Sequence, residues 1–443
     1  MSLNALVIGN DLAALVTALR LHENGFTVRV MEASVSMERP SALPVILHGP
    51  QEHTNSLLQQ MGMAPSLDTL KPLPLEFFTD MEGTSTFRNP CLPTPWHMLI
   101  GLFCFSGISV SSRWKLFNYL EKLWEGEIHL SPKLHIQTAQ DWLISCGQDE
   151  ESQRRIWNPL CLFLLWDHLE QTAALPFIQA LKQHFLDGRT HSPFRISSLE
   201  YVEFALSPIR KRLEQLGVSF HQNNGIRQIR ISGDQLEGVL TEDGQFLKGD
   251  VFIATLSPFQ ITELMPERIL ARLGFFHQLN QLTTVPAVIL NFSFKQFLST
   301  PRLVLTNSMF PWITGYPFPQ MDGGTQSCVS CMATATEQLH SLPDEQLRTM
   351  ALQKIQRIFP ELGTAISQNT QFCDLVRLTQ ACITYSPGTI TFRPSHQTPL
   401  TNFFLAGHWT NTKPVNGIEG DIQSANLCVE MIKAKTSAGY LGH

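Results

Sequence analysis

The stretch GNDLAA, residues 9–14, has the spacing of a turn that binds a diphosphate. In the usual pattern, G-x-G-x-x-G, the glycines let backbone N–H groups at a helix N-terminus approach the phosphates, and an acidic residue further on binds ribose hydroxyls. Gly9 keeps the first glycine position, whereas Asp11 and Ala14 occupy the other two. Glu32 ends the next apolar run, where the ribose-binding acid is expected. The pattern therefore indicates binding of a dinucleotide.

Asp11 is the largest departure from this pattern. Its carboxylate adds bulk and negative charge where phosphates approach, and two unit charges ~4 Å apart repel by ~4 kcal/mol at an effective dielectric constant of 20. That repulsion weakens a tightly bound cofactor about a thousandfold without preventing its binding. Alternatively, Asp11 only caps the helix of an unoccupied unit. Both interpretations stay open at this point.

The elements that position these residues form a βαβ unit. Residues 3–8 are a short apolar run typical of a buried parallel strand. Residues 12–24 carry apolar groups at helical spacing, and Gly25 ends that helix. Residues 27–33 alternate and predict the second strand.

Later segments predict a second structural unit between the chain ends. Residues 96–190 are mostly helical in pattern, and Asp-Gln and Asp-Gly turns in 226–250 predict hairpin strands. Residues 286–295 and 303–333 look like strands of a second sheet, followed by an amphipathic helix over 344–362.

The C-terminal segment FFLAGHWTNTKPVNGIEGDIQSA, residues 403–425, is similar to the closing motif of flavoprotein amine oxidases and carotenoid desaturases. In that motif a strand ends in Leu-Ala-Gly-Asp, and a helix begins with Ile-Glu-Gly-Ala. His408 replaces the acid and Asp421 replaces the small residue. The resemblance places the helix N-terminus beside a flavin ring, where its dipole favours the reduced, anionic flavin.

Over nearly its full length the chain resembles the squalene-associated, FAD-dependent desaturase family, whose namesake is hydroxysqualene dehydroxylase, within the flavin amine oxidase and phytoene desaturase superfamily. Residues 154–181 resemble its Leu-Trp-x-Pro-Leu-Cys stretch, 216–231 its second adenine-contacting segment and 95–103 its apolar substrate-side helix. The resemblance implies an α/β fold in which a Rossmann-like FAD/NAD(P)-binding domain carries an inserted β-rich and helical substrate domain. The expected parts are 1–75, 196–260 and 396–443 for the dinucleotide-binding domain, 76–195 for the helical, membrane-facing part and 261–395 for the substrate-domain sheet and helix.

The motifs and the resemblance together imply FAD as the cofactor, with NADPH as a candidate electron donor. Ile226 is expected over the adenine, and Arg39 is the candidate to replace the arginine of a Gly-Gly-Arg motif that this chain lacks. No catalytic residue is assigned, because the flavin would carry the chemistry. The expected cofactor-binding residues are Gly9, Asn10, Asp11, Ala13, Ala14, Glu32, Ala33, Arg39, Ile226, Gly407, His408 and Ile418.

Composition limits the classes of partner. Hydrophobic residues make up 43% of the 443 residues and charged residues 16%, and the net charge of −6 provides no basic field for nucleic acid. The nine cysteines are scattered, and the pair Cys328 and Cys331 has no second pair to form a metal site, so we expect reduced thiols in the cytoplasm and no metal. No apolar run reaches the ~18–20 residues of a membrane-spanning helix, although residues 98–105 could rest on a membrane surface.

The leading hypothesis from sequence is an oxidoreductase of squalene, hopanoid or carotenoid-type metabolism that replaces the hydroxyl of an apolar isoprenoid with hydride from reduced flavin. Two alternatives stay open. One is a flavin-free relative that binds lipid or a partner protein, and the other is a different FAD-dependent amine oxidase or desaturase. The oligomeric state is not predicted.

Overall fold

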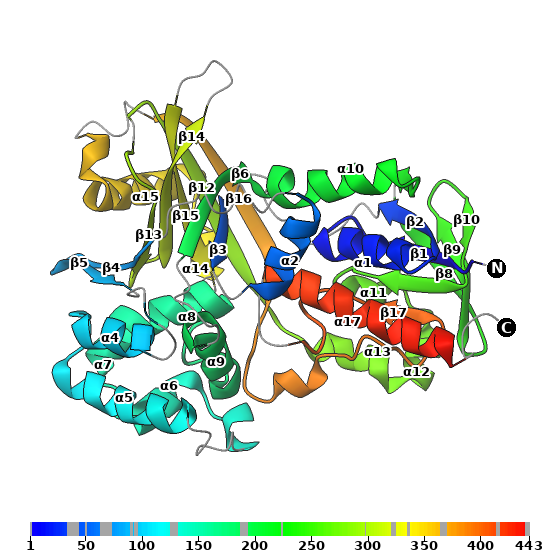
Figure 1. The fold of residues 1–443 in the computed structure, drawn as a ribbon, viewed down its shortest axis with the longest axis horizontal. Coiled ribbons are helices and arrows are strands. Elements are labelled where there is room, and N and C mark those ends of the chain that lie inside the picture. The colour runs from blue at the N-terminus through cyan, green and yellow to red at the C-terminus, as the bar shows by residue number, and fades with distance from the viewer. Residues whose placement is uncertain are drawn as a thin grey trace.

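The chain folds into two adjoining parts, with the N-terminal strand and the C-terminal helix at the same end of the molecule (Figure 1). A parallel sheet and its helices form one part, and a larger mixed sheet with a helical layer forms the other. The computed structural model describes residues 2–32, 44–48, 51–62, 73–88, 92, 96–124, 132–186, 194–222, 225–296, 298–319, 325–334, 337–363, 370–412 and 417–438.

The parallel sheet joins strands from three distant segments of the chain. Its order is β17-β11-β1-β2-β7, and every neighbouring pair is parallel. The βαβ unit predicted at the N-terminus and the Rossmann-like fold class are confirmed. The strands are β1 (Asn4–Ile8), β2 (Thr27–Glu32), β7 (Ser219–Gln222), β11 (Val251–Ala254) and β17 (Phe403–Leu405).

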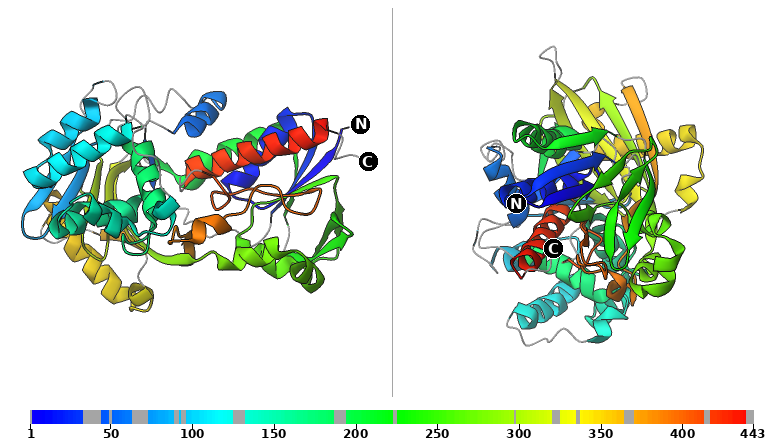
Figure 2. Two further views of the ribbon diagram at one scale, coloured as in Figure 1. Left: turned by 90° about the horizontal axis from the view of Figure 1, so that it is seen from below. Right: turned by 90° about the vertical axis from the view of Figure 1, so that its right-hand side faces the viewer.

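The side chains of β1 are buried on both faces of this sheet, because successive residues of a strand point to opposite sides. Ala5 and Val7 pack against α1 (Leu12–Glu23), α10 (Ser207–Gln215) and α17 (Ile418–Ser437). Figure 2 shows α17 lying beside α1 over the sheet. Leu6 and Ile8 pack on the opposite face against a small antiparallel sheet and three short helices. Those elements are β8 (Ile226–Ser232), β9 (Gln235–Thr241), β10 (Phe246–Lys248), α11 (Pro258–Leu264), α12 (Glu267–Arg272) and α13 (Gly274–Gln278).

The larger sheet has the strand order β16-β12-β15-β14-β13-β4-β5. The strand predicted around Cys328 and Cys331 is confirmed as β15. The last two strands in this order, β4 and β5, come from the proline-rich stretch before residue 95, where the sequence predicted no clear element. The strands are β4 (Leu75–Thr79), β5 (Gly83–Phe87), β12 (Thr284–Phe294), β13 (Arg302–Thr306), β14 (Trp312–Pro319), β15 (Thr325–Thr334) and β16 (Thr370–Ile383).

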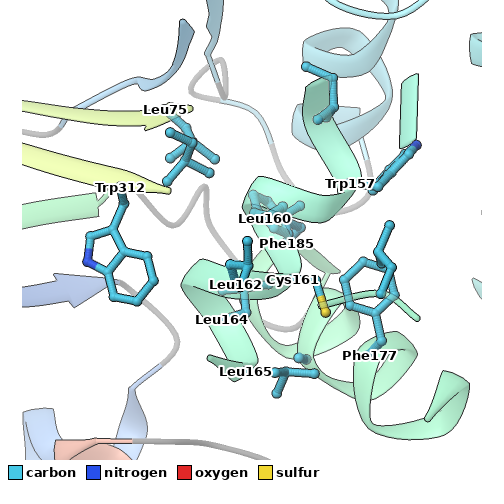
Figure 3. Packing of buried hydrophobic residues seen from close by; sticks show 14 of the residues in the cluster. Leu75, Trp157, Leu160, Cys161, Leu162, Leu164, Leu165, Phe177, Phe185 and Trp312 are labelled. Atoms are coloured by element: carbon cyan, nitrogen blue, oxygen red, sulfur yellow. The ribbon is translucent and has the colours of Figure 1, made fainter. Parts of the chain in front are cut away.

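Helices cover both faces of this larger sheet. The amphipathic helix α15 (Asp344–Ile358) packs on one face. On the other face, the leucines of α8 lie in one buried hydrophobic cluster with Leu75 and Trp312 of the sheet and Phe177 of the next helix (Figure 3). The helices of this layer are α4 (Trp96–Cys104), α5 (Val110–Trp124), α6 (Ala139–Ser145), α7 (Glu150–Ser152), α8 (Asn158–Leu165) and α9 (Ala174–Leu181).

Short elements connect the two parts. The strands β3 (Pro44–His48) and β6 (Phe194–Glu200) pair antiparallel, and α2 (Glu52–Gln60) packs against α17. Within the described part of the chain, no helix is both long and apolar enough to cross a membrane. The remaining segments are α14 (Glu337–His340), 3₁₀ turns at Pro132–His135, Leu279–Gln281, Pro360–Leu362 and Thr389–Phe392, and π-helical turns at Gln153–Trp157, Lys182–Leu186 and Val202–Leu206.

Candidate functional site

Most of the predicted site residues that the structure describes lie at or near the carboxyl edge of the parallel sheet. The amide of Gly9 donates to the carbonyl of Met31 at 2.9 Å, and the amide of Thr255 donates to that of Ile8 at 2.9 Å. The loop after β17 joins the same edge, because the amide of Ala406 donates to the carbonyl of Ala254 at 3.0 Å. In open α/β sheets, ligands bind outside this edge.

Gly9 is required by the packing of the sheet. Its φ of +145° disfavours other residues, and a Cβ there would lie 2.0 Å from Oγ1 of Thr255. The neighbouring strand therefore excludes a side chain, whether or not a phosphate is bound. For this reason Gly9 alone is weak evidence for a cofactor.

Asp11 caps the first helix with its own carboxylate. Oδ1 accepts a hydrogen bond from the amide of Ala14 at 2.9 Å, and the first intrahelical bond runs from the amide of Leu15 to the Asp11 carbonyl. The amides of Leu12 and Ala13 precede that bond, so they point out of the helix start. Two backbone donors therefore remain for an anion, and Asp11 takes the third.

Glu32 lies at the end of β2, as predicted for a ribose-binding acid, and it already holds an arginine. Its Oε1 pairs with Nη1 of Arg210 on α10. Arg210 also donates from Nε to Glu214 at 3.1 Å and lies 4.6 Å from the centre of the Phe220 ring. The spacing of Glu32 gave no indication of this partner.

Other predicted contacts divide into those at this edge and those outside the described residues. Gln222 of β7 pairs in register with Glu32, and Ile226 begins β8 a few residues further on. Asn10 is exposed beside the turn, and Ala13 is buried in the first helix turn. The predictions for Ala33 and Arg39 concern residues outside those that the structure describes.

A cavity of about 220 Å³ lies where the two parts of the molecule meet. Its walls are mainly aromatic and aliphatic, with a few polar side chains. Such a lining suits a largely apolar ligand that carries few polar groups. The lining residues used below are the aromatic Phe163, Trp166, Phe194, Tyr201 and Trp312, the polar Gln51, His184, Thr314, Ser330 and His408, and Gly417 and Ile418 at the start of α17.

Trp166 has an unusual backbone in the cavity wall. It ends α8 with φ +67°, a left-handed conformation that is rare for a bulky side chain. Its ring meets that of Trp312 edge to face, with the centroids 5.6 Å apart. Unusual backbone conformations of this kind often occur at binding sites, and the indole of Trp166 lies in the wall of the cavity.

His184 is a second cavity residue, which the sequence analysis did not single out. It belongs to the π-helical turn Lys182–Leu186, an irregularity that is frequent at functional sites. Burial lowers the pKa of its imidazole to about 3, so the ring is neutral near pH 7. No motif in the sequence identifies His184, because its position in the cavity wall depends on how this π-helical turn packs against the sheet.

His408 lies in the cavity wall as a consequence of the loop that follows β17. Its Nδ1 lies 2.9 Å from Oδ1 of Asp421 in the first turn of α17. Gly407, with φ +137°, leaves no room for a Cβ, which would meet Nε1 of Trp409 at 2.6 Å. Of the predicted residues, Gly407, His408 and Ile418 are therefore brought together, and Asp421 is the functional partner that the prediction missed.

The carboxylate of Glu419 lies at the N-terminus of a second helix, α2. Its Oε2 accepts hydrogen bonds from the amide of Thr54 at 2.8 Å and from Oγ1 of Thr54 at 2.7 Å, and Oε1 accepts from the amide of His53 at 3.1 Å. These bonds tie α17 to the first turn of α2. Acidic side chains thus lie at the starts of α1, α2 and α17.

The fold and this edge define a two-part protein built on a Rossmann-like dinucleotide-binding domain. Residues 44–432 match the family described as flavin containing amine oxidoreductase. The chain belongs to this family, and the family implies a flavin cofactor of the FAD type.

Similar proteins include carotenoid enzymes and an oxidoreductase. The zeta-carotene desaturase of Synechocystis sp. is 24% identical over 322 residues, which make up 66% of this chain and just under two thirds, 65%, of that protein. The probable zeta-carotene desaturase of Synechococcus elongatus is 23% identical over 418 residues, 88% of this chain and 84% of that one. The crystal structure of an oxidoreductase from Methanosarcina mazei has a TM-score of 0.69 at 13% identity, covering 96% of this chain and 100% of that chain. At this identity the structural likeness shows the fold.

The described residues fit a flavin dinucleotide, with an electrostatic penalty at its phosphates. The amides of Leu12 and Ala13 and the dipole of α1 would hold the diphosphate, and Glu32 lies where a ribose would bind. Gly417 and Ile418 open into the cavity, where an aromatic ring system would be held. Asp11 opposes the phosphates, so we expect binding weaker than an all-glycine turn would give.

Proposed function

We propose that this protein is an FAD-dependent oxidoreductase that acts on an apolar isoprenoid alcohol and replaces its allylic hydroxyl with hydride, as hydroxysqualene dehydroxylase does. When bound, FAD would supply the two-electron chemistry. The chain itself would hold the isoprenoid, exclude water and position the hydroxyl.

The cavity at the junction of the two parts is the observation that carries this proposal. It is lined by five aromatic rings, and its polar side chains are few. A hydrocarbon chain would contact the rings of Phe163, Trp166 and Trp312, and burial of each methylene contributes ~0.8 kcal/mol. The names of the carotenoid-desaturating relatives support an isoprenoid as the ligand.

An exposed apolar face on α4 and α5 supports a route by which such a substrate enters. Trp96, Phe103 and Trp114 are 60%, 64% and 55% exposed, and the rings of Phe103 and Trp114 meet edge to face at 6.4 Å. Nη1 of Arg113 holds the two helices together by donating to the Phe103 carbonyl at 2.6 Å. We propose that this face rests on a membrane, because aromatic side chains favour the membrane interface.

Aromatic rings also connect that face with the cavity. The inner side of α4 lines a small apolar space of about 40 Å³ that includes Phe105 and Phe185. The Phe185 ring lies 6.3 Å from that of Phe194, which is 5.8 Å from Phe163 in the main cavity. An apolar molecule that leaves a membrane at α4 would therefore meet hydrophobic surface along this path.

The test begins with the visible spectrum of the purified protein, before and after FAD is added. A flavin band, followed by conversion of hydroxysqualene to squalene under anaerobic conditions with chemically reduced protein, supports the proposal. Flavin binding without that conversion, while a carotene is desaturated, would identify a desaturase instead.

A flavin-free relative that binds lipid is the second candidate. It is favoured by the acidic side chains at three helix starts, Asp11, Glu419 and Asp421, because each is negative where an anionic cofactor needs positive charge. A protein that stays colourless in excess FAD and releases an isoprenoid on solvent extraction would establish this second function.

A further inference from the structure

His408 and Asp421 form a buried pair at the wall of the cavity. Nδ1 of His408 lies 2.9 Å from Oδ1 of Asp421, and the backbone amide of His408 donates to the same oxygen at 3.2 Å. The His408 side chain is 7% exposed and that of Asp421 2%. In the closing motif that this segment resembles, an acid and a small residue occupy these positions. The two departures are therefore in direct contact.

The surroundings fasten the helix and the loop that carry this pair. Asp421 belongs to the first turn of α17, where the helix dipole stabilises a carboxylate. The buried Arg393 donates from Nη1 to the carbonyl of His408 at 3.0 Å. On the next turn of α17, Oγ of Ser424 accepts from the Gly407 amide at 2.8 Å and lies 2.9 Å from Oγ1 of Thr410. These bonds hold the backbone of the loop, whereas the imidazole itself is held by Asp421.

The chemistry of such a pair is directional. A carboxylate at Nδ1 favours the tautomer that carries its proton on that nitrogen, so Nε2 accepts a hydrogen bond when the ring is neutral and donates one when it is protonated. In either state the Nε2 edge can bind a hydroxyl group. Among mainly apolar walls, a hydrogen bond of this kind counts strongly, because the hydroxyl of a bound alcohol would otherwise be buried there without a partner.

We propose that His408 is the residue that binds the hydroxyl of the ligand, and that Asp421 is the positioning residue that holds its ring. The cavity then selects an apolar alcohol over the hydrocarbon of the same skeleton. This inference rests on the proposed function in one respect, the apolar alcohol as ligand. It needs no flavin, and it assigns a role to two residues of this chain that depart from the family motif.

The other titratable side chains in the cavity wall are His184, Tyr201 and Cys382. Burial keeps His184 neutral near pH 7, so it could offer a second hydrogen bond to a hydroxyl. The experiment must therefore separate the contribution of His408 from that of His184, and from a simple structural role for the pair in fastening the loop to α17.

The experiment compares farnesol with the matching hydrocarbon that lacks its hydroxyl, using quenching of tryptophan fluorescence to measure binding to the whole protein. We expect the parent protein to favour farnesol about tenfold, as one net hydrogen bond would give. His408→Phe should bring that ratio close to one while hydrocarbon binding persists, and His408→Gln, which keeps a hydrogen-bonding group, should retain part of it. Asp421→Asn should give an intermediate ratio, because the ring is held less firmly.

Two controls keep the outcome clear. Thr410→Val removes a hydroxyl that fastens the same loop and is not in the cavity wall, so it should leave the ratio unchanged, whereas a purely structural role predicts loss in both variants. His184→Gln tests the second histidine. An equal affinity for alcohol and hydrocarbon in the parent, or a preference that survives in His408→Phe, overturns the inference. If the protein does not take up FAD but still prefers the alcohol, the proposed oxidoreductase activity is ruled out and the binding role of His408 stands.

Discussion

The carboxylate of Asp11 accepts a hydrogen bond from the backbone amide of Ala14, 2.9 Å away, at the helix start where a dinucleotide would place its phosphates. The Asp11 side chain thus takes up a backbone N–H group, that of Ala14, which a bound cofactor would otherwise use as a hydrogen-bond donor. The same residue supplies negative charge at the positive end of the helix. These two effects both oppose the cofactor, and they can be separated by substitution.

Asp11→Gly is expected to tighten FAD binding by between about tenfold and a thousandfold, since it removes ~1–4 kcal/mol of repulsion from a partly exposed position. Asp11→Asn keeps a capping oxygen for the Ala14 amide and removes the charge. A similar gain in Asn and Gly would assign the effect to charge, and a gain in Gly alone would assign it to the occupied donor. Quenching of flavin fluorescence measures the affinity; no gain in either variant would place Asp11 away from the phosphates.

Glu419 should contribute strongly to stability because three donors converge on its buried carboxylate. Glu419→Gln leaves one acceptor oxygen for those donors, and we expect a loss of about 2–4 kcal/mol in the free energy of unfolding in urea. Thr54→Val is the matched control, because it removes one of the three bonds and should cost about 1 kcal/mol. Equal losses in the two variants would contradict a central role for the carboxylate.

His184 should make the protein sensitive to acid. Burial lowers the pKa of its imidazole to about 3 in the folded state, against about 6.5 in an unfolded chain. As the pH falls from about 6.5 toward 3, the unfolded chain takes up a proton that the folded one does not, so the free energy of unfolding falls by up to about 1.4 kcal/mol per pH unit.

The variant that checks this is His184→Gln, which cannot be protonated. Its stability, followed by urea unfolding between about pH 4 and 8, should decline less steeply in acid than that of the parent. Toward about pH 8 the two curves should run parallel, since that is well above the unfolded pKa of about 6.5 and His184 is uncharged there in both the folded and the unfolded chain. The remaining slope of the variant includes His396, whose pKa burial also lowers. Identical slopes in acid would contradict the prediction.

The exposed face of α4 and α5 should bind lipid vesicles. Replacement of Phe103 and Trp114 by Asp should abolish most co-sedimentation with liposomes, because each ring contributes about 1.5–3 kcal/mol when it is buried. Leu427→Asp, on the solvent side of α17 in the other part of the molecule, is the control and should sediment like the parent. Sedimentation that persists in the double variant would exclude this face as the membrane contact.

Local patterns in the sequence predicted much of the fold. The apolar run before Gly9 became β1, the helical spacing after it became α1, and the segment beginning at Ile418 became α17. These elements depend on nearest neighbours and on hydrophobic periodicity, which a single sequence contains. The strands β4 and β5 escaped prediction. Strand β4 joins the sheet by pairing with β13, more than two hundred residues away, and β5 joins it only through β4.

The site was predictable only as far as motifs reach. Glu32 and His408 lie at the sheet edge where the motifs predicted them, and their roles in cofactor binding stay predictions. Their partners Arg210 and Asp421 were not predicted as contacts. Each partner comes from another element, and the helix packing that brings it close leaves no spacing signal. Both His408 and Asp421 depart from the motif, and two unusual residues in one motif are a sign in the sequence that they compensate each other.

The late position of β17 has a consequence for biosynthesis. Phe403–Leu405 completes the sheet by pairing with β11, a strand made about 150 residues earlier. Until a ribosome has released that strand and α17, a nascent chain carries β11 with one unpaired edge, and such edges recruit other strands. Yield in a heterologous host should therefore respond to chaperone supply and to the speed of translation between β11 and α17.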